Sequence, residues 1–219
     1  MKRTLYILSG AGDPENDLYR KAYDLIRSHA IKLGYGDIVT QGWPGQKSFP
    51  GEGVLNQAHS VDLAVELLKA AEDNGVKYDV ICRSYGNTVF LDACRHIRLN
   101  GIGFASLWGI SAYSEIYRLF VDQLEATILY SKDKGVSVDQ TFFPTVVPAR
   151  ILLERFDQPF QLNVLWGSLE KYCPRSYMQY LRESNGLPNI RFQIIEGLEH
   201  EVVHDSGVYL SALFNQFGN

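Results

Sequence analysis

Residues 78–86 read YDVICRSYG, and this stretch decides which fold the sequence predicts. It opens with an apolar run typical of a buried strand, and residues 87–99 carry the apolar spacing of a helix. A strand that turns sharply into a helix lifts the residue at the turn, Ser84, clear of the sheet. Small residues are needed two positions before and after that serine, and Cys82 and Gly86 meet the need. The stretch therefore predicts an elbow that presents Ser84 as a nucleophile; the alternative is an ordinary turn in which Ser84 caps the helix.

Short apolar runs alternate with helical patterns on both sides of this stretch. Such alternation is typical of a mostly parallel sheet with helices on both faces, so the fold class expected is α/β with about six strands. We expect strands at residues 4–9, 37–40, 78–82, 103–108, 161–166 and 190–195, and helices at 17–33, 60–74 (with Ser60 as its N-cap), 87–99 and 208–217.

One segment, residues 112–159, is longer than an ordinary crossover between strands. Its pattern predicts a helix at 114–131, a polar loop at 132–140 and a second short helix around 149–155. Because the segment is rich in aromatic residues, we expect a small helical cap that shapes a substrate pocket within a single domain, residues 1–219. The alternative is a long crossover with its own packing.

The composition excludes several function classes. Lys and Arg total 21 against 25 Asp and Glu, for a net charge of −4, and the basic residues are scattered, so no nucleic-acid partner is expected. No apolar run approaches the roughly 18 residues of a membrane span. The apolar stretch after residues 1–3 is also too short for a signal peptide. The three cysteines form no CxxC pair, which argues against a disulfide framework and favours a reducing, cytoplasmic location.

Two loops supply the groups that a serine nucleophile requires. Glu170 follows the fifth expected strand in VLWGSLE, and His200 follows the sixth in IIEGLEH. Reactive groups gather at the carboxyl ends of parallel strands, so we expect both residues beside Ser84. A serine needs a base to take its proton, and the base needs an acid to hold its tautomer. The order therefore predicts a Ser84–His200–Glu170 triad; the alternative acids are Asp157, Glu115 and Glu199.

The motifs YDVICRSYG, VLWGSLE and IIEGLEH together resemble the α/β-hydrolase superfamily over nearly the whole chain. The resemblance implies the α/β-hydrolase fold and a serine hydrolase of the carboxylesterase or thioesterase kind. Such an enzyme cleaves a carboxylic ester or related acyl bond through an acyl-enzyme, with a small-molecule acyl substrate as its partner and no metal or cofactor. The same fold also acts on thioesters, amides and carbon–carbon bonds, and these remain open.

The first loop, SGAGD at residues 9–13, stands where the family carries its oxyanion loop, with Ser9 in place of the usual histidine. Two backbone N–H groups hold the oxyanion there, one of them from the residue after the nucleophile. We assign them to Ala11 and Tyr85, with Gly12 as the alternative to Ala11. The loop matches neither of the glycine patterns that cradle nucleotide phosphates.

A rival motif overlaps the expected histidine. Residues 200–204 read HEVVH, a literal match to the zinc-metallopeptidase signature, which requires a helix that places His200 and His204 on one face with Glu201 as general base. Because a strand and Gly197 run directly into the motif, we expect Glu201 and His204 to begin the closing helix instead. A catalytically inactive hydrolase fold used for binding is the other alternative, since three positions depart from the commonest pattern: Ser9, Cys82 and Glu170.

Overall fold

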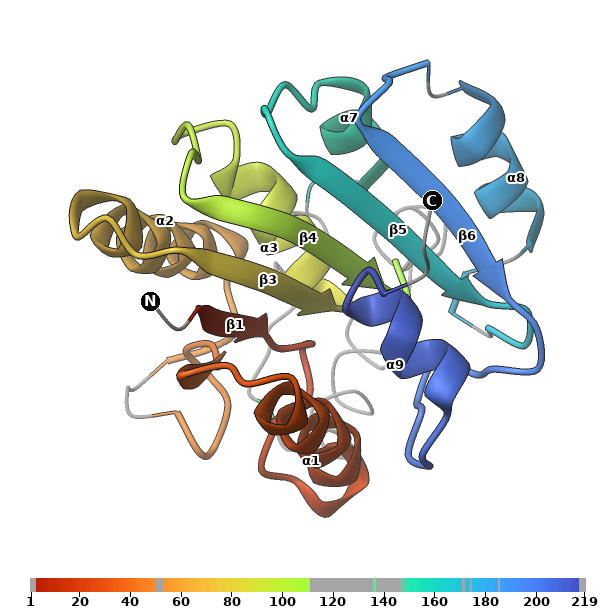
Figure 1. Cartoon of the computed structure of the whole chain (residues 1–219), viewed down its shortest axis with the longest axis horizontal. Coiled ribbons are helices and arrows are strands. Elements are labelled where there is room, and N and C mark those ends of the chain that lie inside the picture. The colour runs from red at the N-terminus through yellow and green to blue at the C-terminus, as the bar shows by residue number, and fades with distance from the viewer. Residues whose placement is uncertain are drawn as a thin grey trace.

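The computed structural model describes residues 3–49, 53–110, 136, 147, 149–170, 172–173, 175–184 and 186–216. Within these residues, six parallel strands form one sheet in the order β2-β1-β3-β4-β5-β6 (Figure 1). The strands are β1 (Thr4–Leu8), β2 (Asp37–Gln41), β3 (Tyr78–Arg83), β4 (Ile102–Trp108), β5 (Gln161–Gly167) and β6 (Ile190–Ile195). Every boundary agrees with the sequence prediction to within one residue, so the expected parallel sheet is confirmed.

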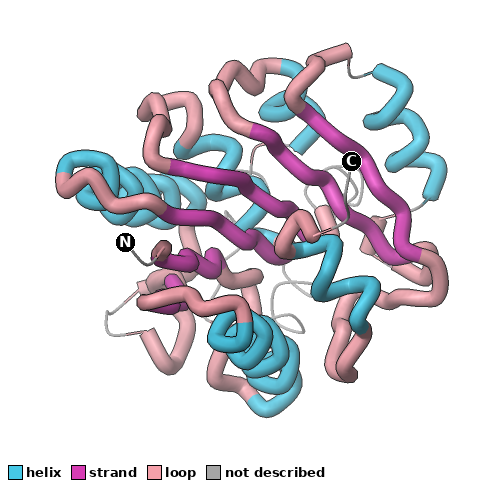
Figure 2. Tube along the Cα trace, viewed as in Figure 1, coloured by secondary structure: helices cyan, strands magenta, loops and turns pink. Residues whose placement is uncertain are grey.

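Helices cover both faces of this sheet (Figures 1 and 2). The described helices are α1 (Asp17–Lys32), α2 (Gln57–Asp73), α3 (Tyr85–Ala93), α7 (Ala149–Glu154), α8 (Arg175–Ser184) and α9 (Gly207–Leu213). Side chains of α1 and α9 form one apolar core with the strands, and side chains of α2, α3, α7 and α8 form the other. Two-sided burial explains why the strands are apolar runs rather than alternating patterns.

The central strand shows how the two cores share the sheet. All six residues of β3 are buried. Ile81 belongs to the core beneath α1 and α9, whereas Val80 and Cys82 belong to the core beneath α2 and α3. Ser84 follows directly after this strand, so its turn starts from a strand that is packed on both faces.

Helices α2 and α3 differ from the prediction at both ends. Ser60 does not cap α2, because Asn56 does so with its Oδ1 atom 3.2 Å from the His59 nitrogen. Asparagine is as good an N-cap as serine, and Ser60 instead lies buried within the helix. Helix α3 begins at Tyr85 and ends at Ala93, six residues short of the prediction. Beyond this end, where carbonyl groups have no partner within the helix, Gln158 Nε2 donates to Cys94 O at 2.6 Å and to Ile97 O at 2.9 Å.

The remaining differences lie in the second half of the chain. Helix α8 was not predicted, although Tyr177, Met178 and Leu181 have helical spacing; of its described side chains only Met178 and Leu181 are buried. Helix α9 is shorter than expected and begins at Gly207, with the Ser206 hydroxyl 3.3 Å from the Tyr209 nitrogen as its cap.

Most of the expected cap lies outside the described residues. This applies to the expected helix at 114–131 and to the polar loop at 132–140 apart from Val136. The second helix, expected around 149–155, is confirmed as α7. Val136 forms an isolated antiparallel bridge with Gln46, so the segment between β4 and β5 touches the loop that follows β2.

Candidate active site

Ser84 lies at a strained turn between β3 and α3. Its φ is 50° and its ψ is −115°, a conformation that a residue with a side chain adopts only when its surroundings enforce it. The Ser84 N–H donates to Trp108 O at 2.9 Å, and its carbonyl accepts from the Asn87 N–H at 3.0 Å. The half-buried Ser84 side chain forms no capping hydrogen bond with α3. The simple helix-cap alternative therefore does not describe this turn.

Gly86 permits the elbow to pack against β1. A Cβ atom at this position would lie 2.4 Å from Leu8 O and 2.6 Å from Ser9 O. These are backbone atoms at the end of a central strand, so they have little freedom to move away. The glycine two residues after the serine is thus a packing requirement of the turn.

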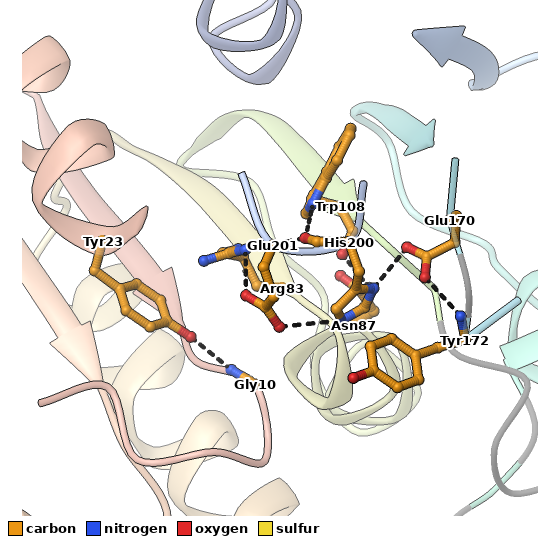
Figure 3. Close-up of polar contacts among 9 residues, drawn as sticks. All are labelled: Gly10, Tyr23, Arg83, Asn87, Trp108, Glu170, Tyr172, His200 and Glu201. Carbon is orange, nitrogen blue, oxygen red and sulfur yellow. Dashed lines mark hydrogen bonds and ion pairs between the residues drawn. The ribbon is translucent and has the colours of Figure 1, made fainter. Parts of the chain in front are cut away.

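His200 and Glu170 form a buried pair at the carboxyl ends of β6 and β5 (Figure 3). His200 Nδ1 lies 2.6 Å from Glu170 Oε2, and the two side chains are 5% and 0% exposed. The other Glu170 oxygen accepts from the Tyr172 N–H at 2.8 Å, and the Tyr172 ring meets the His200 ring edge-on at 4.7 Å. Both carboxylate oxygens are therefore occupied, which holds the carboxylate in one orientation toward the imidazole.

The end of β4 joins this pair to the elbow. Trp108 O accepts the Ser84 N–H, and the next residue, Gly109, lies against the histidine. A Cβ atom on Gly109 would lie 2.7 Å from His200 Nδ1 and 3.2 Å from Glu170 Oε2. Gly109 also has a φ of 63°, which favours glycine. The sequence interpretation did not include Gly109, although a glycine directly after a strand was the available signal.

The His200 backbone is held from two neighbouring strands (Figure 3). Its carbonyl accepts from Trp108 Nε1 at 2.8 Å and from Arg83 Nη2 at 3.2 Å. Trp108 ends β4, and Arg83 ends β3 directly before Ser84. The loop that carries the histidine is thereby tied to the two strands that position the serine.

Arg83 is a buried cation that pairs with the Glu201 carboxylate. Its side chain is 4% exposed, lies over the Tyr23 ring at 5.2 Å, and has Nη2 at 3.2 Å from Glu201 Oε2. The second Glu201 oxygen is 3.9 Å from His200 Nε2. Glu201 is thus a second carboxylate beside the histidine, on the ring nitrogen opposite Glu170, and this role was not predicted from the sequence.

We expect Arg83→Met to lower the free energy of unfolding by about 2–4 kcal/mol, because it leaves the Glu201 carboxylate without its cation and removes one of the two donors to the His200 carbonyl. Urea unfolding measures the change. Arg20→Met is the matched control, since Arg20 pairs with Asp17 on an exposed face where both side chains are more than half exposed. That control is expected to lose less than about 0.5 kcal/mol. Equal losses in the two variants would contradict the expectation.

The loop at residues 9–13 lies directly beside the elbow. A Cβ atom on Gly10 would be 3.3 Å from the Ser84 Cβ. The Gly10 N–H donates to the Tyr23 hydroxyl at 2.9 Å, and burial raises the pKa of Tyr23, so that hydroxyl stays protonated. Within the described part of the chain, the Ala11 N–H has no hydrogen-bond acceptor. The loop is therefore close enough for a free N–H group to donate a hydrogen bond to a group bound at Ser84.

Residues 200–204 do not form the helix that a zinc-metallopeptidase motif requires. They lie in bends and irregular chain, and α9 begins only at Gly207, so the expectation that Glu201 and His204 start the closing helix is wrong. The Ser206 cap explains the later start. His204 is exposed while His200 is buried. In the described ranges, no group of three or more His, Cys, Asp and Glu side chains is arranged to hold a metal ion.

Of the alternative acids, Asp157 and Glu199 form no ion pair with His200 within the described residues. Asp157 lies before β5, at the amino-terminal ends of the strands and so opposite the candidate site. Its 96% exposed side chain pairs with Arg98. Glu199 is exposed. Glu115 lies outside the described residues.

The cysteine in the elbow does not compete with the serine as a nucleophile. Burial raises the pKa of the Cys82 thiol well above its usual value, so the reactive thiolate is absent at neutral pH. Cys82, Cys94 and Cys173 are all buried free thiols. Separately, none of the described helices has the length and apolar character needed to cross a membrane.

No protein-family model matches the sequence, and no curated protein matches it either. Solved structures do match. A monoacylglycerol lipase from Paleococcus ferrophilus has a TM-score of 0.66 at 15% identity, covering 97% of this chain and 93% of that one. The esterase RhEst1 from Rhodococcus sp. ECU1013 has a TM-score of 0.65 at 16% identity, covering 98% and 90%. Est1E from Butyrivibrio proteoclasticus, in a structure with bound ferulic acid, has a TM-score of 0.65 at 12% identity, covering 96% and 85%. At these identities the likeness shows the fold alone, and the fold that this chain adopts is that of the α/β-hydrolases.

Proposed function

We propose that this protein is a serine hydrolase that cleaves a carboxylic ester or related acyl bond through Ser84, His200 and Glu170. The observation that carries the proposal is the 2.6 Å contact between His200 Nδ1 and Glu170 Oε2 in a buried pair. A histidine held by a carboxylate at Nδ1 keeps that nitrogen protonated and leaves Nε2 as a base. The strained elbow that carries Ser84 lies at the same edge of the sheet, which supports a role for all three residues in one reaction.

The reaction follows from the chemistry of these groups. Ser84 Oγ attacks the acyl carbonyl carbon while His200 Nε2 takes the hydroxyl proton, and Glu170 stabilises the resulting imidazolium. The N–H groups of Ala11 and Tyr85 hold the oxyanion of the tetrahedral intermediate. His200 then gives its proton to the leaving oxygen, which leaves an acyl group on Ser84. Water attacks this acyl-enzyme with the same histidine as base and releases the acid.

Small carboxylic esters are the proposed substrate class. Lipases and esterases are among the solved structures that this chain resembles over nearly its whole length. The chemistry of Ser84 and His200 suits any activated acyl carbonyl, so thioesters belong to the same proposal.

We also propose that residues 112–159 form a cap over the site within a single domain. The bridge between Gln46 and Val136 supports this arrangement, since it brings the segment to the loop beside residues 9–13.

Labelling with a fluorophosphonate probe tests the proposed function. We expect the wild-type protein to be labelled and Ser84→Ala to remain unlabelled, because the probe phosphonylates only an activated serine. Addition of a chelator is expected to change neither result. Circular dichroism of Ser84→Ala supplies the folding control.

Two outcomes would count against the triad. An unlabelled wild type whose esterase or peptidase activity disappears with chelator would indicate the zinc alternative. A folded protein that neither takes up the probe nor turns over esters would favour an inactive binding module.

A further inference from the structure

A buried glutamine stands behind the loop at residues 9–13. Gln46 is 2% exposed and lies in the loop between β2 and α2. Its Nε2 atom is 2.9 Å from Gly10 O, 3.2 Å from Ala11 O and 2.9 Å from Gly12 O. One side chain thus contacts three consecutive carbonyl groups of the loop to which the oxyanion donor is assigned.

The orientation of the Gln46 amide is determined by its other partner. Its Oε1 atom accepts from the Trp43 N–H at 2.8 Å. If the amide were reversed, its oxygen would face three carbonyl oxygens and its NH₂ group would face an N–H group, so only one orientation satisfies both sides. The two hydrogens on Nε2 are then shared among the three carbonyl groups.

Holding these carbonyl groups also aims the N–H groups of the loop. In a trans peptide unit, the C=O of one residue and the N–H of the next point in opposite directions, and the described chain has no cis peptide bond. When Gly10 O faces Gln46, the Ala11 N–H therefore points away from Gln46. In the same way, because Ala11 O faces Gln46, the Gly12 N–H also points away from Gln46. Gln46 therefore orients both N–H groups, of Ala11 and of Gly12, that the sequence offered as oxyanion donors.

Neighbouring contacts hold the rest of this loop. Trp43 Nε1 donates to Ser9 O at 2.8 Å. At the other end of the loop, the Asp13 carboxylate accepts from the Ser48 N–H at 2.7 Å and from the Ser48 hydroxyl. Because Tyr23 accepts the Gly10 N–H, Ala11 is the first residue of the loop whose N–H has no acceptor within the described chain.

We propose that Gln46 is a positioning residue for catalysis: it holds the Gly10, Ala11 and Gly12 carbonyl groups so that the Ala11 N–H faces the oxyanion formed at Ser84. This inference rests on the proposed serine hydrolase function. Gln46 itself does not touch the substrate. Its effect falls on the transition state, because a donor fixed before the reaction stabilises developing charge without a reorganisation cost.

A second buried glutamine provides a matched control. Gln158 is 4% exposed, and its Nε2 donates to Cys94 O and Ile97 O while its Oε1 accepts from the Leu99 N–H at 3.1 Å. It therefore makes the same kind of backbone contacts as Gln46. It precedes β5, however, and so lies at the amino-terminal ends of the strands, whereas the candidate site lies at their carboxyl ends.

The experiment compares Gln46→Met with Gln158→Met in the full-length protein. Both variants lose buried hydrogen bonds, so thermal unfolding is expected to show a lower midpoint for each. For a p-nitrophenyl ester, Gln46→Met is expected to lower kcat about 10–100-fold with KM changed less than about 3-fold. Inhibition by an alkyl boronic acid, whose serine adduct is tetrahedral, is expected to weaken by a similar factor. Gln158→Met is expected to leave kcat, KM and boronic-acid inhibition within about 2-fold of wild type.

Gln46→Asn gives a second measurement, because it keeps the amide but withdraws it by one methylene group. We expect an intermediate loss of kcat, and this variant carries the test if Gln46→Met does not fold. Wild-type kcat in a folded Gln46 variant, or equal losses in the Gln46 and Gln158 variants, would overturn the inference while leaving the triad intact. Ester hydrolysis that survives in the Ser84→Ala variant would instead overturn the proposed function itself.

Discussion

Replacing His200 with alanine is expected to lower kcat for ester hydrolysis by about 10⁶-fold, because the serine then has no base and the leaving group has no acid. His204→Ala is the control, because it separates the triad from the zinc alternative. The triad needs only His200, whereas the zinc alternative needs both histidines of the HEVVH segment. His204 is exposed and lies outside any helix, so its replacement is expected to change kcat by less than about 2-fold.

Steady-state kinetics with a p-nitrophenyl ester measure both variants. The order of effects separates the two mechanisms, since losses of similar size in His200→Ala and His204→Ala would contradict the triad. Labelling of His200→Ala by the fluorophosphonate probe is expected to be lost together with turnover, because Ser84 reacts only when its proton is removed. Retained circular dichroism excludes unfolding as the cause.

The second large effect is expected at Glu170. Glu170→Gln keeps the size of the side chain but replaces the carboxylate that holds His200 Nδ1, and we expect kcat to fall about 10⁴-fold. An amide that donates toward Nδ1 favours the tautomer with the proton on Nε2, and that tautomer cannot accept the serine proton. Burial makes the effect large, because no water reaches a carboxylate side chain that is 0% exposed to replace the lost contact.

Glu201→Gln is the control for this variant. Glu201 lies 3.9 Å from His200 Nε2, which is the nitrogen that must be free to act as the base. Its carboxylate pairs with Arg83, so we expect a loss of stability but a change in kcat of less than about 10-fold. If Glu201→Gln lost more activity than Glu170→Gln, the acid would have been assigned to the wrong carboxylate. Kinetics and urea unfolding on both variants separate the catalytic effect from the structural one.

Much of the fold could be predicted because strand and turn signals are local. The apolar run at 190–195 predicted β6 with its observed ends, and the small residues around Ser84 predicted the turn after β3. Helix α8 was not predicted because it carries few apolar residues, although those it has follow helical spacing. Ser60 was chosen as an N-cap because its residue type fits, but Asn56, a few positions earlier, fits equally well. Residue type alone does not choose between neighbouring caps.

By itself, the sequence predicted which residues would lie together at the carboxyl ends of the strands. Parallel strands bring their carboxyl ends to one edge, so the residues that follow β3, β5 and β6 were expected together before any contact was known. The order of the strands alone therefore predicts that Ser84, Glu170 and His200 lie near one another. For HEVVH, the sequence argued against a metal-binding helix but wrongly predicted that Glu201 and His204 begin the closing helix, which starts only at Gly207.

Only the tertiary structure decided how those groups are held. His200 and Glu170 are 30 residues apart, Gln46 and Gly10 are 36 apart, and Arg83 reaches the His200 carbonyl across 117 residues. Hydrophobic spacing reports which face of a strand or helix is buried, and it carries no information about which distant side chain meets that face. Such contacts depend on the packing of all the layers at once. For this reason the buried Glu170 carboxylate, the Arg83–Glu201 pair and the Gln46 contacts became visible only in the folded chain.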